Sequence, residues 1–370
     1  MRIKKIQIKN FKSLVDFELE DLKAFCAFVG PNASGKSNIF EALEFTNYVA
    51  TYGFKAMNFF NLNDIVSFNF RPISKFKEAD DPTFIINYDF ESNLPLNSSF
   101  YTYKKEQSNE YEIKGVASPF VDNFNGPHYR PFLILDASDF EKRKEFTVRW
   151  KERGNTYDQE LEQFIDNFSR LFVGKSNLNR TPTIAGKLAP DASNLSQIVG
   201  KVFEDENVRI DFIDWLRILI PEFENIEVKK SNIDRSFEFF LYEKSSNKPF
   251  PKNLISDGTY NILALMTAVY QNNQPQFLCI EEPENGLHPQ AIQLLVDFFR
   301  EKCEEKDHHI WLNTHSQTLV RCLEIDEIIL VNKVDGETRA KQLTKEANID
   351  IKTDEAWLSN ALGGGVLWSK

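Results

Sequence analysis

The 370-residue sequence has no long hydrophobic run and few cysteines. No segment approaches the roughly 18 consecutive apolar residues that a membrane-spanning helix needs, and no apolar stretch follows the charges at the N-terminus. We therefore expect a cytoplasmic protein that is neither exported nor inserted into a membrane. The four cysteines lack the spacing of metal ligands, so we expect buried apolar side chains rather than structural zinc or disulfides: Cys26, Cys279, Cys303 and Cys322.

Positive charge is also scarce. The 44 Lys and Arg residues are outnumbered by 55 Asp and Glu residues, which gives a formal net charge of −11. A protein that coats nucleic acid with its whole surface needs clustered cations to neutralise phosphates, so the composition disfavours that class and leaves open a local contact with DNA. Acidic residues interrupt the one basic cluster, so a solvated face is a better interpretation of it than a binding patch: Lys142, Arg143, Lys144, Arg149, Lys151 and Arg153.

Apolar periodicity is abundant. The first apolar residues alternate, at 3, 6 and 8 and again at 15, 17 and 19, and predict two antiparallel strands. A third apolar run, from Phe25 to Val29, ends at Gly30, and from Lys36 onward the spacing becomes that of a helix. Short alternating segments then predict an antiparallel β-subdomain: 84–90 and 100–103.

Helical spacing dominates the middle of the chain. Apolar residues between 161 and 172 recur every three or four positions and predict a helix, but no heptad pattern lasts long enough for a coiled coil. Two further helices are predicted, one after Ser256 and one from Pro289.

Strand-like runs return in the last third of the chain, and the alternation of strands with helices predicts a mainly parallel sheet. The pair Asp335-Gly336 predicts a hairpin. The predicted strands are 237–242, 277–280, 310–313 and 328–332. We therefore assign the chain to the α/β class and divide it into an N-terminal lobe, a helical insertion and a C-terminal lobe: 1–140, 141–250 and 251–370.

The most specific motif lies between a predicted strand and a predicted helix. Residues 30–37 read GPNASGKS, a full G-x-x-x-x-G-K-[ST] phosphate loop. Its glycines permit a tight turn whose backbone N–H groups face a phosphate, beside the positive end of the helix dipole. Lys36 would hold the β- and γ-phosphates, and Ser37 would give its hydroxyl to Mg²⁺. A chance glycine-rich loop is the weaker alternative.

A second motif ends the predicted strand at 277–280. The strand leads into Glu281 and Glu282, as the Walker B element does beside a phosphate loop. Consecutive residues at a strand end point to different sides, so Glu281 would orient the Mg²⁺ shell and Glu282 would polarise the attacking water. An acidic strand end alone is more often a surface feature, and the phosphate loop reverses that preference.

These segments resemble the ABC-type ATPase heads of the SMC and RecF kind, and most closely the RecF-like predicted AAA-family ATPases of bacteria. The stretches IQIKNFKS (6–13), GPNASGKSN (30–38) and EEPENGLHP (281–289) carry the resemblance, with the less specific PDASNL (190–195). It implies a P-loop NTPase fold of ABC type with a mixed β-sheet, and ATP and Mg²⁺ as cofactors. Ser37 and Glu281 would bind the metal. The implied nucleotide-binding residues are Lys12, Gly30, Pro31, Asn32, Ala33, Ser34, Gly35, Lys36, Ser37, Asn38, Ser256 and Gly258.

The segment LISDGT (254–259) is similar to the family's signature motif, Leu-Ser-Gly-Gly-Gln, with Asp257 in place of a glycine. In the family this serine binds the γ-phosphate held by a second subunit, which implies a homodimer closed around two nucleotides. The simpler interpretation is that Ser256 caps the helix that follows and does nothing more.

The histidines divide by position. His315 follows a predicted strand and resembles the family's switch histidine, which contacts the γ-phosphate; a structural histidine is the alternative. His288 would help to start a helix or touch the dimer partner. His128, His308 and His309 have the pattern of surface residues. We assign no glutamine to the family's Q-loop, which couples the nucleotide to the helical subdomain.

The resemblance implies an ATP-gated clamp, in which ATP closes two copies and hydrolysis releases them, with Lys36, Glu282 and His315 as catalytic residues. It also implies a role in DNA metabolism or antiphage defence, with a separately encoded effector such as a nuclease. The alternatives are a DNA-binding or scaffold clamp with negligible turnover, an ABC transporter motor, and a nuclease like the OLD enzymes. For the last, we expect the chain after His315 to be too short for an added catalytic domain.

Overall fold

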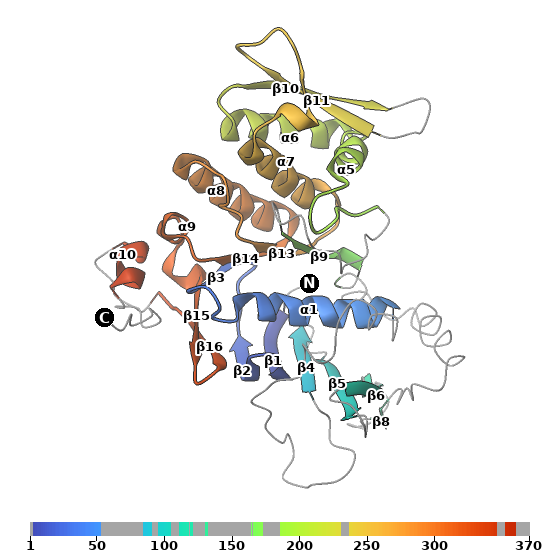
Figure 1. The fold of residues 1–370 in the computed structure, drawn as a ribbon, viewed down its shortest axis with the longest axis vertical. Coiled ribbons are helices and arrows are strands. Elements are labelled where there is room, and N and C mark those ends of the chain that lie inside the picture. Colours follow the sequence, from blue (N-terminus) through green and yellow to red (C-terminus); the bar gives the residue numbers. More distant parts are fainter. Residues whose placement is uncertain are drawn as a thin grey trace.

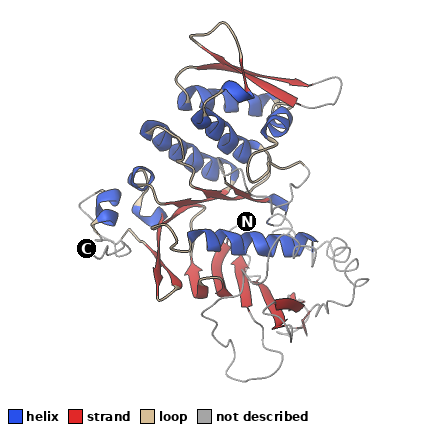
Figure 2. Cartoon of the chain, in the orientation of Figure 1, coloured by secondary structure: helices blue, strands red, loops and turns tan. Residues whose placement is uncertain are grey.

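A computed structural model describes the following residues: 3–52, 84–90, 95–104, 111–117, 119–120, 130–131, 164, 166–172, 186–230, 237–345 and 352–359. These residues form layers around a central sheet, with helices on both of its faces (Figures 1 and 2). The basic cluster between 142 and 153 and His128 lie outside the described residues.

The middle layer is a six-stranded sheet with the strand order β16-β15-β3-β14-β13-β9. Neighbouring strands are parallel except at one edge, where β16 runs antiparallel to β15. The predicted mainly parallel sheet is confirmed. Its strands are β3 (Phe25–Val29), β9 (Phe168–Leu171), β13 (Phe277–Glu281), β14 (His309–Thr314), β15 (Ile328–Val334) and β16 (Glu337–Gln342).

The central sheet is buried on both faces because its strands alternate between two hydrophobic cores. In β3, Phe25, Ala27 and Val29 belong to one core, whereas Cys26 and Phe28 belong to the other. Every residue of β3 is buried, which explains why its sequence is continuously apolar rather than alternating. Such a sheet requires helices on each face.

One face carries α1 (Lys36–Tyr52), which lies between the central sheet and a second, antiparallel sheet (Figure 1). Because α1 is covered on both sides, Phe40 and Phe45 are as fully buried as Ile39 and Leu43. The predicted antiparallel strands are confirmed. The second sheet contains β2 (Leu14–Glu20), β1 (Ile3–Phe11), β4 (Phe84–Phe90), β5 (Pro95–Lys104) and β6 (Tyr111–Ala117), and β7 (Pro119–Phe120) pairs with β8 (Arg130–Pro131).

The opposite face is covered by four helices, and a three-stranded antiparallel sheet lies outside them (Figure 1). The helices are α5 (Leu195–Val202), α6 (Glu206–Leu219), α7 (Asp257–Tyr270) and α8 (Pro289–Lys306), and the strands are β10 (Phe223–Lys230), β11 (Phe237–Glu243) and β12 (Phe250–Pro251). Ten residues of α7 are buried, so this helix runs through the core rather than along the surface. The short helices α9 (Gln317–Arg321) and α10 (Thr353–Leu358) follow β14 and β16.

One predicted helix is wrong at its end. Residues 164, 166 and 167 are helical, but Phe168–Leu171 form β9, which pairs in parallel with β13 at the edge of the central sheet. Phe168 stacks on Phe277 in one core, and Leu171 enters the other. The three-residue spacing therefore arises from a strand that contributes to both faces, and pairing with β13 outweighs the local helical pattern.

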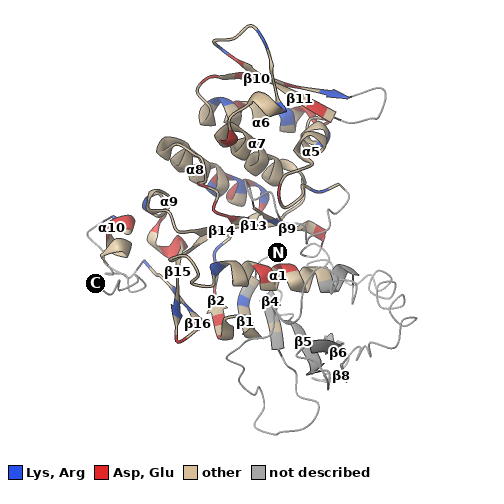
Figure 3. Ribbon diagram, in the orientation of Figure 1, with Lys and Arg blue, Asp and Glu red and all other residues tan. Residues whose placement is uncertain are grey.

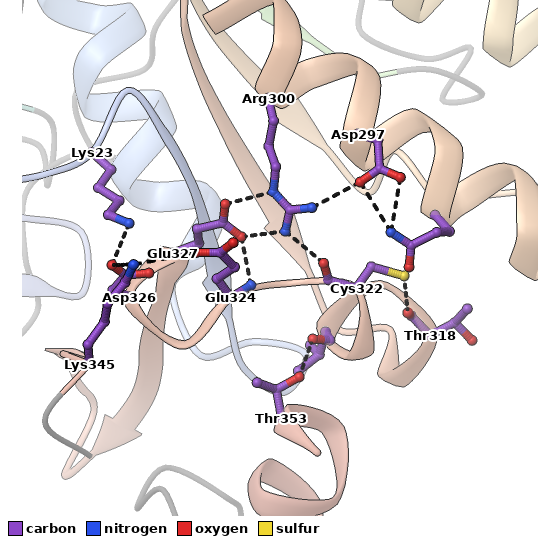
Figure 4. Close-up of polar contacts among 12 residues, drawn as sticks. Lys23, Asp297, Arg300, Thr318, Cys322, Glu324, Asp326, Glu327, Lys345 and Thr353 are labelled. Atoms are coloured by element: carbon purple, nitrogen blue, oxygen red, sulfur yellow. Dashed lines mark hydrogen bonds and ion pairs between the residues drawn. The ribbon is translucent and has the colours of Figure 1, made fainter. Parts of the chain in front are cut away.

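The hairpin between β15 and β16 is confirmed, with φ of 51° at Asp335 and 81° at Gly336, as a tight two-residue turn requires. A polar network lies at the other end of β15 (Figure 4). There the Arg300 guanidinium of α8 donates two hydrogen bonds to Glu327, at 2.8 and 2.7 Å, and one to the Cys322 carbonyl at 2.7 Å. This network ties α8 to the amino end of the sheet.

The four cysteines are free, as expected, and three of them are buried. Among the described residues, none of the helices combines the length and the apolar character needed to cross a membrane.

Candidate functional site

The predicted phosphate loop joins β3 to α1 and is packed tightly against two other strands. A Cβ added to Gly30 would lie 2.0 Å from the Val331 carbonyl oxygen, and one added to Gly35 would lie 1.9 Å from Thr338 Oγ1. Gly35 also has a φ of 98°, and Ala33 one of 62°. The two glycines of the motif are thus required by packing against β15 and β16 as well as by the turn.

The buried hydroxyl groups of Thr338 and Ser13 support this loop. Thr338 Oγ1 in β16 donates to the Ser34 carbonyl at 3.0 Å and lies 2.6 Å from Ser13 Oγ. Ser13 Oγ also accepts from the Asn38 side chain at 2.7 Å, and its backbone carbonyl accepts from the Thr338 N–H at 2.8 Å. Sequence reasoning missed Thr338, because a threonine in a polar edge strand carries no motif.

Lys36 begins α1 and folds back over the loop. Its Nζ donates to the Gly30 and Pro31 carbonyls, both at 2.8 Å, and the residue is only 6% exposed. Burial lowers the pKa of Lys36 to about 8, against the opposing attraction of nearby carboxylates, of which Glu281 is the strongest. The first turn of α1 carries no acidic residue, which leaves its positive dipole end open to an anion (Figure 3).

Ser37, Glu281 and Asn313 meet beside the phosphate loop. Ser37 Oγ donates to Glu281 Oε2 at 2.7 Å, and the Asn313 amide donates to the same oxygen at 2.6 Å and to Ser37 Oγ at 3.1 Å. A hydroxyl and a carboxylate are ligands that Mg²⁺ prefers, and Mg²⁺ usually takes one or two protein ligands together with substrate phosphates. The described residues hold no cluster of three or more His, Cys, Asp or Glu that could bind a metal.

Arg170 of β9 lies on the other side of Glu281, and sequence reasoning also missed it. Its guanidinium donates to Glu281 Oε1 at 2.6 and 3.1 Å, to Glu44 Oε2 at 2.8 Å and to the Ser37 carbonyl at 3.3 Å. Burial disfavours the charged guanidinium, but Glu281 and Glu44 outweigh this effect and raise the pKa of Arg170. Burial likewise raises the pKa of Glu44, and Arg170 opposes that shift. Glu281 therefore has a fixed counter-ion.

Glu282 leaves the strand in a left-handed conformation, with a φ of 49°. Its backbone N–H donates to the Asn313 carbonyl at 2.8 Å. Its carboxylate accepts from the Asn285 amide at 3.0 Å and lies 3.6 Å from His315 Nδ1. The structure thus brings together Glu282 and His315, two of the predicted catalytic residues, on a partly exposed surface.

Glu284 is a second buried carboxylate in this loop. Thr314 Oγ1 donates to Glu284 Oε1 at 2.6 Å and accepts from the Ser316 N–H at 3.0 Å, which fixes the backbone on both sides of His315. Burial raises the pKa of Glu284. We interpret Glu284 as a support for the histidine loop, since it lies beneath the surface rather than on it.

Ser256 caps α7, as predicted: its Oγ accepts from the Thr259 N–H at 3.1 Å. Ser256 itself is exposed. Behind it, a Cβ on Gly258 would lie 2.6 Å from the Gly286 carbonyl oxygen, and the Asn261 amide donates to the Asn285 carbonyl at 2.8 Å. The start of α7 is therefore packed directly against the loop that carries Glu282.

Lys12, predicted to bind nucleotide, has a positive φ of 50° and pairs with Glu41 of α1 at 2.6 Å. His288 caps α8 by accepting from the Gln290 N–H at 3.2 Å, in agreement with its predicted role at a helix start. The sequence assigned no glutamine to a Q-loop. In the structure, the side chains bonded to Glu281 are Ser37, Arg170 and Asn313.

The surface positions predicted for His308 and His309 are wrong. His308 is fully buried and accepts from the Gln276 N–H at 3.2 Å, and burial lowers its pKa to about 4. His309 begins β14 and stacks on Phe277, with 5.9 Å between ring centroids. Polar residues at a strand start favour a surface position, but His308 and His309 are buried where β14 enters the core.

Comparison with known proteins gives one family match across most of the chain. A family model described as "AAA domain, putative AbiEii toxin, Type IV TA system" matches residues 25–321. An ATP/GTP phosphatase of Helicobacter pylori is 21% identical over 350 residues, which cover 87% of each chain. The chromosome partition protein Smc of Methanocaldococcus jannaschii is 54% identical over 43 residues, which are 12% of this chain and 4% of that protein.

Solved structures share the fold. An Smc head bound to the C-winged helix domain of ScpA gives a TM-score of 0.57 at 15% identity and covers 94% of this chain and 100% of that one. A Pyrococcus furiosus Smc head with an extended coiled coil, bound to the C-terminal domain of ScpA, gives 0.56 at 14% identity, with 93% and 96% covered. The predicted α/β fold of the ABC and SMC head type is confirmed.

Proposed function

This chain belongs to the family described as "AAA domain, putative AbiEii toxin, Type IV TA system", and from that premise we propose that it binds ATP with Mg²⁺ and hydrolyses it to ADP and phosphate. The observation that carries this proposal is the junction of three strand ends with the phosphate loop. There Ser37 and Glu281 share a hydrogen bond of 2.7 Å, while Glu282 and His315 lie together on the accessible side.

In this proposal the backbone N–H groups at the start of α1 receive the phosphates, and Lys36 exchanges its two carbonyl contacts for phosphate oxygens. Ser37 and Glu281 would hold Mg²⁺, which when bound neutralises charge on the β- and γ-phosphates. Asn313 keeps both ligands in place, because its amide bonds to each of them.

Glu282 would accept a proton from the attacking water or orient that water, and His315 would contact the γ-phosphate. Their side chains are 23% and 39% exposed, so water and substrate can reach both. The Asn285 amide holds one oxygen of Glu282, which leaves the other toward His315.

We further propose that ATP closes a homodimer in which Ser256 of one copy meets the nucleotide of the other. The position of Ser256 supports this: it is exposed at the start of α7, where backbone N–H groups and the helix dipole favour an anion, and its hydroxyl donates to Thr259 Oγ1 at 2.9 Å. Gly258 and Asn261 pack on the loop that carries Glu282. Dimer closure at Ser256 would therefore affect the position of the catalytic carboxylate in the same chain.

The biological output we propose is DNA metabolism or antiphage defence, with a separately encoded effector such as a nuclease and with DNA as a further partner. The description of the family as a putative toxin of a toxin–antitoxin system favours defence over the transporter alternative. A clamp that binds ATP with negligible turnover is the second candidate, and turnover measurements separate the two.

The test of hydrolysis is steady-state phosphate release from ATP and GTP, in the presence of Mg²⁺ and then of EDTA. We expect Mg²⁺-dependent release that the Lys36→Ala variant abolishes, with Thr338→Ser as a control that keeps the loop support. A rate equal to that of Lys36→Ala would contradict the ATPase and favour the scaffold clamp.

Dimer closure has a separate test. The Glu282→Gln protein, incubated with Mg²⁺ and ATP, is expected to elute from a sizing column as a dimer, whereas the same protein without nucleotide elutes as a monomer. A monomer under both conditions would contradict closure. Adding Ser256→Arg, which places a bulky cation at the proposed contact, is expected to prevent the dimer.

A further inference from the structure

The two oxygens of the Glu281 carboxylate have different hydrogen-bond partners. Both hydrogen bonds from Arg170 reach Oε1, at 2.6 and 3.1 Å, whereas Ser37 and Asn313 bond to Oε2 at 2.7 and 2.6 Å. One oxygen is therefore held on the side of β9 and the other is presented beside the Ser37 hydroxyl. A side chain with both oxygens occupied in this way cannot rotate without breaking charge-assisted bonds.

The charges around Arg170 do not balance within this cluster. The guanidinium faces the two carboxylates of Glu281 and Glu44, and all three side chains are at most 5% exposed. Buried carboxylates need cationic partners: Arg170 supplies one, the nearby Lys36 acts on Glu281 as another, and the Oε2 side of Glu281 is where a metal cation would add to them. This is the side on which the Ser37 hydroxyl lies.

Arg170 also connects this carboxylate to a neighbouring segment. Its guanidinium lies 4.2 Å from the ring centre of Phe172, whose N–H donates to the Pro190 carbonyl at 2.7 Å. At the start of β9, Lys187 Nζ donates to the Phe168 carbonyl at 3.1 Å. Both ends of the strand are thus bonded to residues 187–190.

Space exists for Arg170 to adjust. A cavity of about 30 Å³ lies between α1 and residues 187–190, and its lining includes Glu44, Tyr48, Arg170 and Lys187. A volume of this size holds at least one water molecule. Arg170 therefore lines a small space as well as contacting Glu281, Glu44 and Phe172.

We propose that Arg170 is the positioning residue of the metal site. It fixes Glu281 so that one oxygen can bind Mg²⁺, and through β9 it couples Mg²⁺ binding at that site to residues 187–190. This inference rests on the proposed function, because Mg²⁺ enters with the nucleotide. It assigns to an arginine on β9 the coupling for which the sequence offered no glutamine.

The test uses the double variant Arg170→Gln/Glu44→Gln. It removes one positive and one negative charge, so the net charge of the cluster stays the same while Glu281 loses the guanidinium that holds it. The matched control is Arg300→Gln/Glu327→Gln, which removes another doubly hydrogen-bonded Arg–Glu pair, in which Arg300 is partly exposed, at the opposite end of the sheet (Figure 4). Phosphate release is measured over a range of Mg²⁺ concentrations, and ATP binding is measured separately in EDTA.

We expect the Mg²⁺ concentration for half-maximal release to rise about 10–100-fold in the Arg170 double variant, the usual cost of losing a residue that orients a metal ligand. ATP binding in EDTA stays within about threefold of the wild type by the same reasoning. The Arg300 double variant keeps the wild-type Mg²⁺ dependence, although it unfolds at a lower temperature. An unchanged Mg²⁺ dependence in the Arg170 double variant would overturn the proposal.

A second readout does not depend on turnover. Hydrogen exchange followed by mass spectrometry is expected to show that Mg²⁺ and ATP slow exchange in peptides covering residues 168–172 and 187–190 of the wild type, but not of the double variant. Equal protection in both proteins would overturn the coupling. If the double variant does not fold, Arg170→Lys replaces it, because lysine keeps the charge and loses the fork that holds Oε1.

The two proposals fail differently. A wild-type protein that releases no phosphate from ATP or GTP contradicts the proposed function. A wild-type protein that releases phosphate, together with an Arg170 double variant of wild-type Mg²⁺ dependence, contradicts only the role of Arg170.

Discussion

Glu281 and Glu282 are neighbours in sequence, yet the two carboxylates lie in opposite surroundings. Glu281 is 2% exposed and bonded to Ser37, Arg170 and Asn313, whereas the side chain of Glu282 is 23% exposed, accepts from the Asn285 amide and lies 3.6 Å from His315. The chain achieves this by ending β13 with a left-handed residue at Glu282. One carboxylate is thus buried among its partners before any ligand arrives, and the other lies where water can reach it.

The largest expected effect that distinguishes the two carboxylates is the loss of catalysis when Glu282 is changed. Glu282→Gln is expected to lower the rate of phosphate release about 10²–10⁴-fold, because the amide cannot accept a proton from water. Its free energy of unfolding should stay within about 0.5 kcal/mol of the wild type, since the side chain is partly exposed. Release kinetics and urea denaturation of the same sample check both statements. A fall of less than tenfold would remove Glu282 from the catalytic role.

Glu281→Ala is expected to act on stability. The change removes two charge-assisted hydrogen bonds of the buried Arg170 and leaves it Glu44 alone as counter-ion, so the free energy of unfolding should fall by about 3–5 kcal/mol. Urea denaturation in EDTA measures this without any contribution from metal. A loss below about 1 kcal/mol, the range of exposed ion pairs, would show that the site is less rigid than its contacts suggest.

The buried Lys36 should make ATP hydrolysis depend on pH. Lys36 has a pKa of about 8 in the free protein, so it is charged below that pH and loses its charge above it. Hence kcat/KM for ATP should be level below pH 8 and fall about tenfold per pH unit above it. Lys36→Arg should remove this inflection, because arginine stays protonated. A level profile up to pH 10 in the wild type would contradict the assignment.

The smallest expected effect is on stability, at the start of α7, the helix that packs on the loop of Glu282. Ser256→Ala removes the cap of α7 and should lower the free energy of unfolding by about 1 kcal/mol. Ser256→Asn keeps a capping oxygen and should restore most of that stability. If Ser256 also meets a partner's nucleotide, the asparagine variant should still fail to form the ATP dimer. Full dimer formation by that variant would leave Ser256 as a cap alone.

Most of the fold was predictable because the parallel strands carry continuous apolar runs and the helices have clear starts, such as His288-Pro289 for α8. β9 was not, since Phe168 and Leu171 enter opposite cores and their spacing imitates a helix. The surface positions predicted for His308 and His309 failed because polarity outweighed packing in that prediction: His309 stacks on Phe277, and His308 accepts a hydrogen bond from Gln276.

The candidate site divides in the same way. Lys36, Ser37, Glu281 and Glu282 could be proposed because each stands in a motif with fixed spacing. Arg170 is 111 residues from Glu281 in sequence, and nothing around it signals a partner. Its role depends on which strand pairs with β13, and that is settled by tertiary pairing rather than by local pattern.

The contact between Thr338 and the phosphate loop joins residues 304 positions apart. A growing polypeptide therefore cannot complete its nucleotide cradle until nearly the whole described chain has left the ribosome. Fragments that end before β16 would therefore emerge with the loop's sequence but without the hydroxyl that supports it.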